Sequence, residues 1–145
     1  MSPGRSTPRF ALPPRRPSIL IVDGDDDTRL LYRTILEPIA SSILEAEDGA
    51  AGLAAALAQH PDDVITETRL HRLDGYSLCE RLKADSHTSS SLRLVVTGSA
   101  LPSDFEHARE SGADRLLTKP CTPEDLQSTV LHMWFHKQSA YVVPH

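Results

Sequence analysis

The fold of this chain is decided by a short apolar run, Ile19-Leu20-Ile21-Val22, which ends at Asp23. Such a run of β-branched and leucine residues is typical of a strand that is buried on both faces of a parallel sheet. The acidic segment Asp25–Asp27 follows directly, and it supplies an N-cap and first-turn acids for a helix. The run therefore predicts a strand, a short turn and a helix in that order.

The same alternation of strand and helix continues along the chain, giving five such units in all. Further strands are predicted at residues 42–47, 63–67, 92–97 and 116–117, with helices between them. The last helix has Thr122 as its cap and Pro123 in its first turn, and it is expected to run to about Lys137. Five units with short connections imply right-handed crossovers and a doubly wound α/β sheet.

Two helices carry apolar residues that bear on the surface. The first helix is expected to turn one apolar side inward, made of Leu30, Leu31, Ile35 and Leu36. In the last helix the residues 133–135 are Met, Trp and Phe, which cannot all face the core because neighbours lie about 100° apart. Either an exposed aromatic such as Trp134 marks a partner surface, or the segment 141–143 folds back over it.

A doubly wound sheet places its site at the carboxyl ends of the strands, near the switch in strand order. The residues at those ends are Asp23, Glu67, Thr97 and Lys119. Carboxylates, a hydroxyl and an ammonium group are therefore expected to converge at one edge of the sheet.

Six stretches, taken in order, resemble the receiver domain of bacterial response regulators, the CheY-like superfamily. They are residues 19–23, 45–49, 73–75, 94–97, 111–114 and 117–120, and the resemblance covers about residues 17–137. It implies a flavodoxin-like fold, with five parallel strands in the order 2-1-3-4-5 and five helices. It also implies a role in two-component phosphorelay signal transduction.

The resemblance implies a division of labour in the pocket. In the family, two adjacent acids after the first strand bind Mg²⁺, and an aspartate after the third strand accepts a phosphoryl group from a histidine kinase. A Ser or Thr and a Lys then contact the phosphate. This agrees with the chemistry, because the charge on the transferred oxygens must be neutralised.

This sequence departs from that pattern at two central positions. Asp23, Thr97 and Lys119 match, but Gly24 replaces the second acid and Glu67 replaces the acceptor aspartate. The extra methylene moves the carboxylate about 1.5 Å, and a productive pocket tolerates only about 0.5 Å. Three further differences lie at His71 and Arg72, where Pro-Gly is common, and at Leu116, where the family often has an aromatic residue.

These departures leave three interpretations of Glu67 open. The pocket is degenerate, or Glu67 imitates the phosphorylated state by pairing with Lys119, or some phosphorylation remains. No catalytic residue and no cofactor are expected. Asp23 and Glu67 would offer Mg²⁺ a weak site or none. The acids at 25–27 are interpreted as helix caps, and the His132/His136 pair as surface rather than a zinc site.

Composition sets the remaining expectations. Residues 1–17 carry four arginines, five prolines and no acid, so the chain's −5 leaves −9 on the remainder. We expect a disordered basic leader at 1–17, a receiver domain at 18–138 and an extension at 139–145. The acidic domain argues against a nucleic-acid regulator that uses the arginine leader. No apolar span or signal peptide is evident, and two cysteines without metal spacing suggest reduced thiols in the cytoplasm.

The sequence thus predicts an atypical receiver that is not an enzyme and signals through protein contacts. A receiver that accepts phosphate with Mg²⁺ is the alternative. Expected partners are a histidine kinase, another receiver or an effector. A weak homodimer, or a contact with a phosphorylatable receiver, is expected through the fourth helix, fifth strand and fifth helix, with Trp134 as a candidate contact. This face carries charges of both signs: Glu106, Arg109, Asp114, Arg115 and Lys137.

Overall fold

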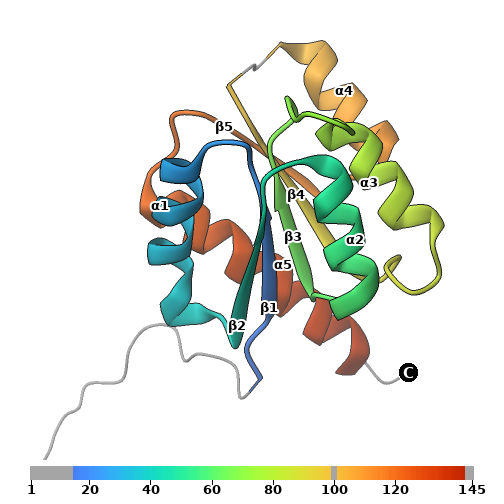
Figure 1. Ribbon diagram of the computed structural model, residues 1–145. Helices are drawn as coiled ribbons and strands as arrows, with labels where there is room; N and C mark the ends of the chain where they lie inside the picture. The colour runs from blue at the N-terminus through green and yellow to red at the C-terminus, as the bar shows by residue number, and fades with distance from the viewer. Residues whose placement is uncertain (1–14, 99–100, 143–145) are drawn as a thin grey trace, which may run out of the picture.

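The computed structural model describes residues 15–98 and 101–142, which form alternating strands and helices (Figure 1). The strands are β1 (Ser18–Val22), β2 (Ser42–Ala46), β3 (Asp63–Thr66), β4 (Leu92–Thr97) and β5 (Arg115–Thr118). The helices are α1 (Asp26–Leu36), η1 (Glu37–Ile39), α2 (Gly49–Gln59), α3 (Gly75–Ala84), α4 (Pro102–Ser111) and α5 (Pro123–Val142). None of the helices in the described ranges combines the length and hydropathy needed to cross a membrane.

All strand pairs are parallel, and the order β2-β1-β3-β4-β5 confirms the prediction. The strand order reverses at β1, which has β2 on one side and β3 on the other. The carboxyl ends of β1 and β3 are level, since Val22 pairs with Thr66. Asp23 and Glu67 therefore leave the sheet side by side.

Helices cover both faces of the sheet, as Figure 1 shows. On one face α1 and α5 pack over Ile19, Ile21 and Ile65, and on the other α2 and α3 pack over Leu20, Val22 and Val64. Successive residues of a strand point to opposite faces, so the apolar run 19–22 supplies both cores. Its four side chains are all 0% exposed.

The predicted inner side of α1 is partly wrong. Leu30 and Leu31 are 62% and 53% exposed, whereas Tyr32 and Leu36 are buried. Residues 30–32 are three consecutive apolar residues, which together cover more than half of the helix circumference. The pattern alone could not decide which of them faces the sheet, and packing chose Tyr32.

An exposed Trp134, which was one of the alternatives for residues 133–135, is also wrong. Trp134 is 0% exposed and Met133 is buried, while Phe135 is half-buried. The segment 15–17, which we call the strap, helps to cover Trp134. Its indole Nε1 donates to the Arg15 carbonyl at 3.0 Å, and the Arg15 guanidinium lies 5.1 Å from the ring centroid.

The strap is fastened to the domain at several points. Arg15 pairs with Asp62 at 3.0 Å, Arg16 donates to the Pro38 carbonyl at 3.3 Å, and Ser41 N donates to the Pro17 carbonyl at 2.8 Å. The end of the expected leader thus contacts the domain, and residues 1–14 lie outside the described part. α5 continues to Val142, past the predicted end near Lys137, and residue 143 lies outside the description.

The helix caps agree with the sequence. Asp25 caps α1, Gly112 ends α4 with φ 95°, and Thr122 accepts from Asp125 N at 3.0 Å. Both cysteines are free, and burial raises the pKa of Cys79 to about 12. The exposed His132 and His136 are consistent with the surface interpretation.

Candidate functional site

The structure brings the four predicted residues together at the carboxyl edge of the sheet. Glu67 follows β3, Thr97 ends β4 and Lys119 follows β5, and all three line a cleft of about 370 Å³ with Arg69 and Gly98. Asp23 lines the neighbouring hollow of about 590 Å³ with Gly24. The backbone locks this edge, because Lys119 N donates to the Thr97 carbonyl at 2.7 Å and Glu67 N to the Val22 carbonyl at 3.2 Å.

The Glu67 carboxylate uses both of its oxygens within the protein. Lys119 Nζ lies 2.8 Å from Oε2, while Oε1 accepts from Thr68 N at 2.9 Å and from Thr68 Oγ1 at 3.1 Å. Thr68 Oγ1 also lies 3.1 Å from Thr97 Oγ1. One carboxylate is therefore linked to the lysine directly and to the threonine through a bridging hydroxyl.

Charge in the pocket is balanced around Lys119. Burial alone would lower the pKa of the Lys119 ammonium, but the hydrogen bond and charge of Glu67, with the charge of Asp23, hold that pKa above its ordinary value. Burial raises the pKa of Asp23, which is 6% exposed and accepts from Asp25 N at 2.9 Å through Oδ1. Asp23 therefore faces the pocket as a desolvated acid.

Two glycines shape the edge in different ways. A Cβ on Gly75 would lie 2.1 Å from the Glu67 carbonyl oxygen, so the loop after β3 closes only with glycine there. A Cβ on Gly24 would meet the Glu47 carbonyl oxygen at 3.6 Å, which is ordinary van der Waals contact, and its φ is not in the left-handed region. The backbone at position 24 would therefore accept an aspartate, and glycine is not required there by its conformation.

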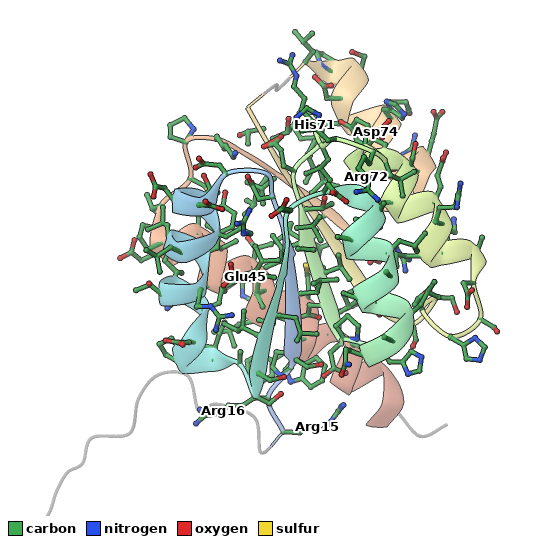
Figure 2. All side chains as sticks on the ribbon, viewed as in Figure 1. Arg15, Arg16, Glu45, His71, Arg72 and Asp74 are labelled. Carbon is green, nitrogen blue, oxygen red and sulfur yellow. The ribbon has the colours of Figure 1, made fainter. Side chains whose placement is uncertain are left out.

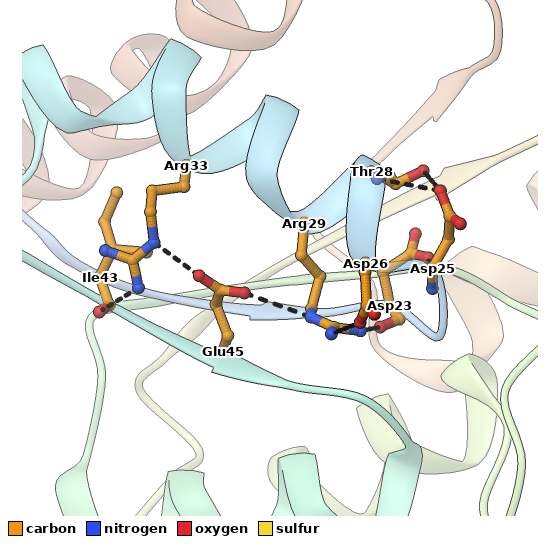
Figure 3. Close-up of polar contacts among 8 residues, drawn as sticks. All are labelled: Asp23, Asp25, Asp26, Thr28, Arg29, Arg33, Ile43 and Glu45. Atoms are coloured by element: carbon orange, nitrogen blue, oxygen red, sulfur yellow. Dashed lines mark hydrogen bonds and ion pairs between the residues drawn. The ribbon is translucent and has the colours of Figure 1, made fainter.

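A network that the sequence analysis missed holds the β1–α1 loop (Figure 3). Arg29, whose side chain is only 11% exposed, donates to the Asp23 carbonyl at 2.6 Å, pairs with Asp26 and contacts Glu45 at 3.2 Å. Glu45 also accepts from Arg33 at 2.5 Å. These contacts tie α1 to β2. The only signal was an arginine spaced three residues after an acid of the first turn.

Thr68 was missed as well, although it stands next to Glu67 in the sequence. Nothing in a single threonine distinguishes it before the fold brings Thr97 within 3.1 Å. The interpretation of Asp25 as a cap is confirmed, because Asp25 accepts from Thr28 N at 2.9 Å and these hydrogen bonds lower its pKa.

The remaining predicted residues lie outside the cleft that Glu67 lines. Figure 2 shows His71, Arg72 and Asp74 together at the end of the molecule away from Arg15 and Arg16. His71 and Arg72 are exposed; Arg72 has φ 66° and lies 3.7 Å from Asp48. Leu116 is half-buried in β5. His71 and Asp74 line the neighbouring hollow that Asp23 also lines, whereas Leu116 lines a separate hollow beside Phe105.

The residues present do not suit Mg²⁺. A compact octahedral ion needs several oxygen ligands that converge without competing partners. Gly24 contributes no carboxylate, and the Glu67 oxygens are taken by Lys119 and Thr68. Within the described ranges, no group of three or more His, Cys, Asp and Glu residues could hold a metal ion.

Comparisons with known proteins agree with this fold. Residues 19–131 match the response regulator receiver domain. The chain is 33% identical to the DNA-binding dual master transcriptional regulator RpaA of Synechocystis over 114 residues, which are 79% of this chain and 47% of that protein. It is 31% identical to Protein PilH of Pseudomonas aeruginosa over 112 residues, 77% of this chain and 93% of that protein.

Solved structures show the same architecture. A CheY-like receiver domain protein from Methanospirillum hungatei superposes with a TM-score of 0.79 at 23% identity, covering 86% of this chain and 98% of that one. At that identity the likeness concerns the fold alone. The chain spans about half the length of the first transcriptional regulators it matches. The chain belongs to the response regulator receiver domain family of two-component signalling proteins.

Proposed function

We propose that this receiver domain signals through protein contacts without phosphorylation of an aspartate. The observation that carries the proposal is the state of Glu67, whose carboxylate is held by Lys119 at 2.8 Å and by Thr68 at 2.9 Å. The group at the acceptor position is thus already paired with the lysine that would contact a phosphate. Gly24 removes a metal ligand beside it. The domain acts as a binding module and not as an enzyme.

The same contacts favour one form of this proposal over a merely inactive pocket. The carboxylate lies directly on Lys119 and reaches Thr97 through Thr68 Oγ1. A negative group on these residues resembles the charge that a phosphoryl group would bring. Glu67 therefore holds the pocket in one state, and partner binding does not wait for a kinase.

The first test is phosphorylation itself. Incubation with acetyl phosphate and Mg²⁺ should leave the intact mass unchanged, because the acceptor is a paired glutamate and one metal ligand is absent. Intact mass spectrometry measures this directly, with a receiver that has all its acids as positive control. A stoichiometric gain of one phosphate, mapped to Glu67 or to a neighbouring acid, would support the working-receiver alternative instead.

Partners remain part of the proposal. The relatives include a histidine kinase, GacS of Pseudomonas protegens, and several transcriptional regulators. For this chain we propose a protein of the same signalling system, either a kinase, another receiver or an effector. We propose that such a partner binds to the face formed by α4, β5 and α5, which also suits a weak homodimer.

That face differs from the one expected from sequence. Trp134 is buried and offers no contact, and Glu106 pairs with Arg109 within α4. Instead Phe105, 48% exposed, borders a hollow of about 240 Å³ beside Leu116 and Arg115. An exposed aromatic next to a hollow is typical of an interface anchor.

Replacing this aromatic should weaken assembly without harming the fold. We expect Phe105→Asp to weaken self-association or partner binding by about tenfold or more, since an anchor typically contributes about 2 kcal/mol. Sedimentation velocity over a concentration series measures the change. Leu57→Asp, at an exposed leucine of α2 on another surface, is the matched control. Equal association constants for both variants would place the interface elsewhere.

A further inference from the structure

A buried acid lies at the end of the sheet opposite the candidate site. Asp63 begins β3 and is 3% exposed. Neither oxygen of its carboxyl group has a hydrogen-bond partner, and no other buried side chain in the described ranges is left in this state. A buried carboxylate without a partner is costly, whereas a neutral carboxyl group is far less so.

Asp63 lies on the face of the sheet that α1 and α5 cover. Asp63 shares its face of β3 with Ile65 because strand residues alternate. Its register partners are Ile19 on β1 and Leu92 on β4. These apolar residues belong to the core that α1 and α5 cover, where Met133 of α5 is also buried.

The charges that face Asp63 come from three neighbouring segments. Asp62, next to it in the chain, accepts from Ser18 and pairs with Arg15. Asp114, just before β5, accepts from Arg93 N at 2.7 Å, and Lys137 of α5 donates to the Ser90 carbonyl. Each is thus engaged elsewhere. Burial, followed by the charge of Asp62, raises the pKa of Asp63 to about 8, although Lys137 opposes this.

The same end of the sheet carries the strap. Arg15 pairs with Asp62 at 3.0 Å, and its guanidinium lies over the ring of Trp134. The Trp134 indole donates to the Arg15 carbonyl. A charge on Asp63 would have to be solvated, and at 3% exposure the carboxyl group meets little water unless neighbouring segments move. The segments at this end of the sheet are the C-terminal half of α5, whose Lys137 is one of the charges that act on Asp63, and the strap, which pairs with Asp62.

We propose that Asp63 is a proton-binding site that keeps the C-terminal half of α5 and the strap closed over the sheet, and that loss of this proton loosens both. The device is separate from the Glu67 pocket, so the two can fail independently. It makes the α5 surface, where partners are proposed to bind, responsive to pH.

The sign of the pH dependence follows from proton counting. An unfolded aspartate has a pKa of about 4, whereas the folded pKa is raised to about 8. Between these values the folded state holds one proton more, so the contribution of Asp63 to stability is fully present below about pH 4, falls as pH rises through this window and is lost above about 8.

Trp134 is the single tryptophan of the sequence and reports on this region directly. We expect its quenching by acrylamide to rise sigmoidally, by about twofold or more as the segment opens locally, with a midpoint near pH 8. Asp63→Asn, which cannot ionise, should give a flat profile. Lys137→Met removes the opposing cation and should move the midpoint upward. Asp27→Asn, an exposed acid of α1, is the control that should leave the midpoint unchanged.

A flat profile in the unmodified protein, or an unchanged sigmoid in Asp63→Asn, overturns the proposal. If that variant does not fold, the carboxyl carbon shift of Asp63, followed by NMR in the unmodified protein, decides the matter. A midpoint below about 6, in the ordinary range of carboxyl groups, would also overturn it.

Discussion

The double variant Gly24→Asp/Glu67→Asp should accept a phosphoryl group from acetyl phosphate in the presence of Mg²⁺. Three aspartate carboxylates, at positions 23, 24 and 67, would then meet beside Thr97 and Lys119. Position 24 has room for the new side chain, since its Cβ would lie 3.6 Å from the nearest other atom, the Glu47 carbonyl oxygen. Its backbone is outside the left-handed region, so an aspartate adds no strain there.

The single variants should do little. Glu67→Asp alone leaves the metal without its second acid, and Gly24→Asp alone leaves the glutamate on Lys119. Groups that act as a unit are strongly non-additive. We therefore expect the rate of phosphorylation of the double variant to exceed the product of the single effects by about tenfold or more.

Intact mass spectrometry over time measures the rate, and titration with Mg²⁺ measures metal affinity. Adding Lys119→Met to the double variant is the matched control, because it should remove phosphorylation while metal binding remains. A folded double variant that binds Mg²⁺ yet takes no phosphate would contradict the expectation. His71, Arg72 and Leu116 would then be the next positions to restore.

Trp134→Ala should destabilise the domain by about 3–5 kcal/mol, because it removes a large, fully buried side chain and leaves a cavity. It also removes the indole donor to Arg15 at 3.0 Å. That loss is a large share of the stability of a small domain, which is about 5–15 kcal/mol. Urea unfolding followed by circular dichroism measures the change in free energy.

Phe105→Ala is the control, since this aromatic is 48% exposed on α4. Its effect on stability should stay within about 0.5 kcal/mol. Trp134→Phe, which keeps most of the buried volume, should lie between the two. A Trp134→Ala variant as stable as the Phe105→Ala variant would mean that Trp134 is not a core residue.

The sequence by itself determined the architecture of this protein. An apolar run such as Ile19–Val22, followed by helix signals, favours a strand that is buried on both faces of a parallel sheet. Repetition of the strand–helix unit then leaves few possible topologies. Caps such as Asp25 and Thr122 were predictable because they act on backbone groups within three residues of themselves. The four pocket residues were predictable because parallel strands end at one edge.

Only the tertiary structure decided which side chains meet across that framework. The sequence placed Glu67 and Lys119 at one edge, but the bridge from Thr68, in the loop after β3, to Thr97, at the end of β4, joins residues 29 positions apart. Arg29 reached the Asp23 carbonyl for the same reason. A periodic pattern states that residues share a face, and not what that face touches.

The apolar helices show this limit most clearly. Leu30, Leu31 and Tyr32 are consecutive, so the helix could have turned any of them inward, and the packing against the sheet selected Tyr32. Trp134 was a candidate for an exposed aromatic, yet Arg15, 119 residues earlier, contacts its indole ring. The sequence gives no sign that Asp63, at the start of a strand, differs from an exposed acid, whereas in the folded domain it is buried on the face that α5 covers. Burial is a property of the assembled layers, whereas a sequence displays only the order of residues within each layer.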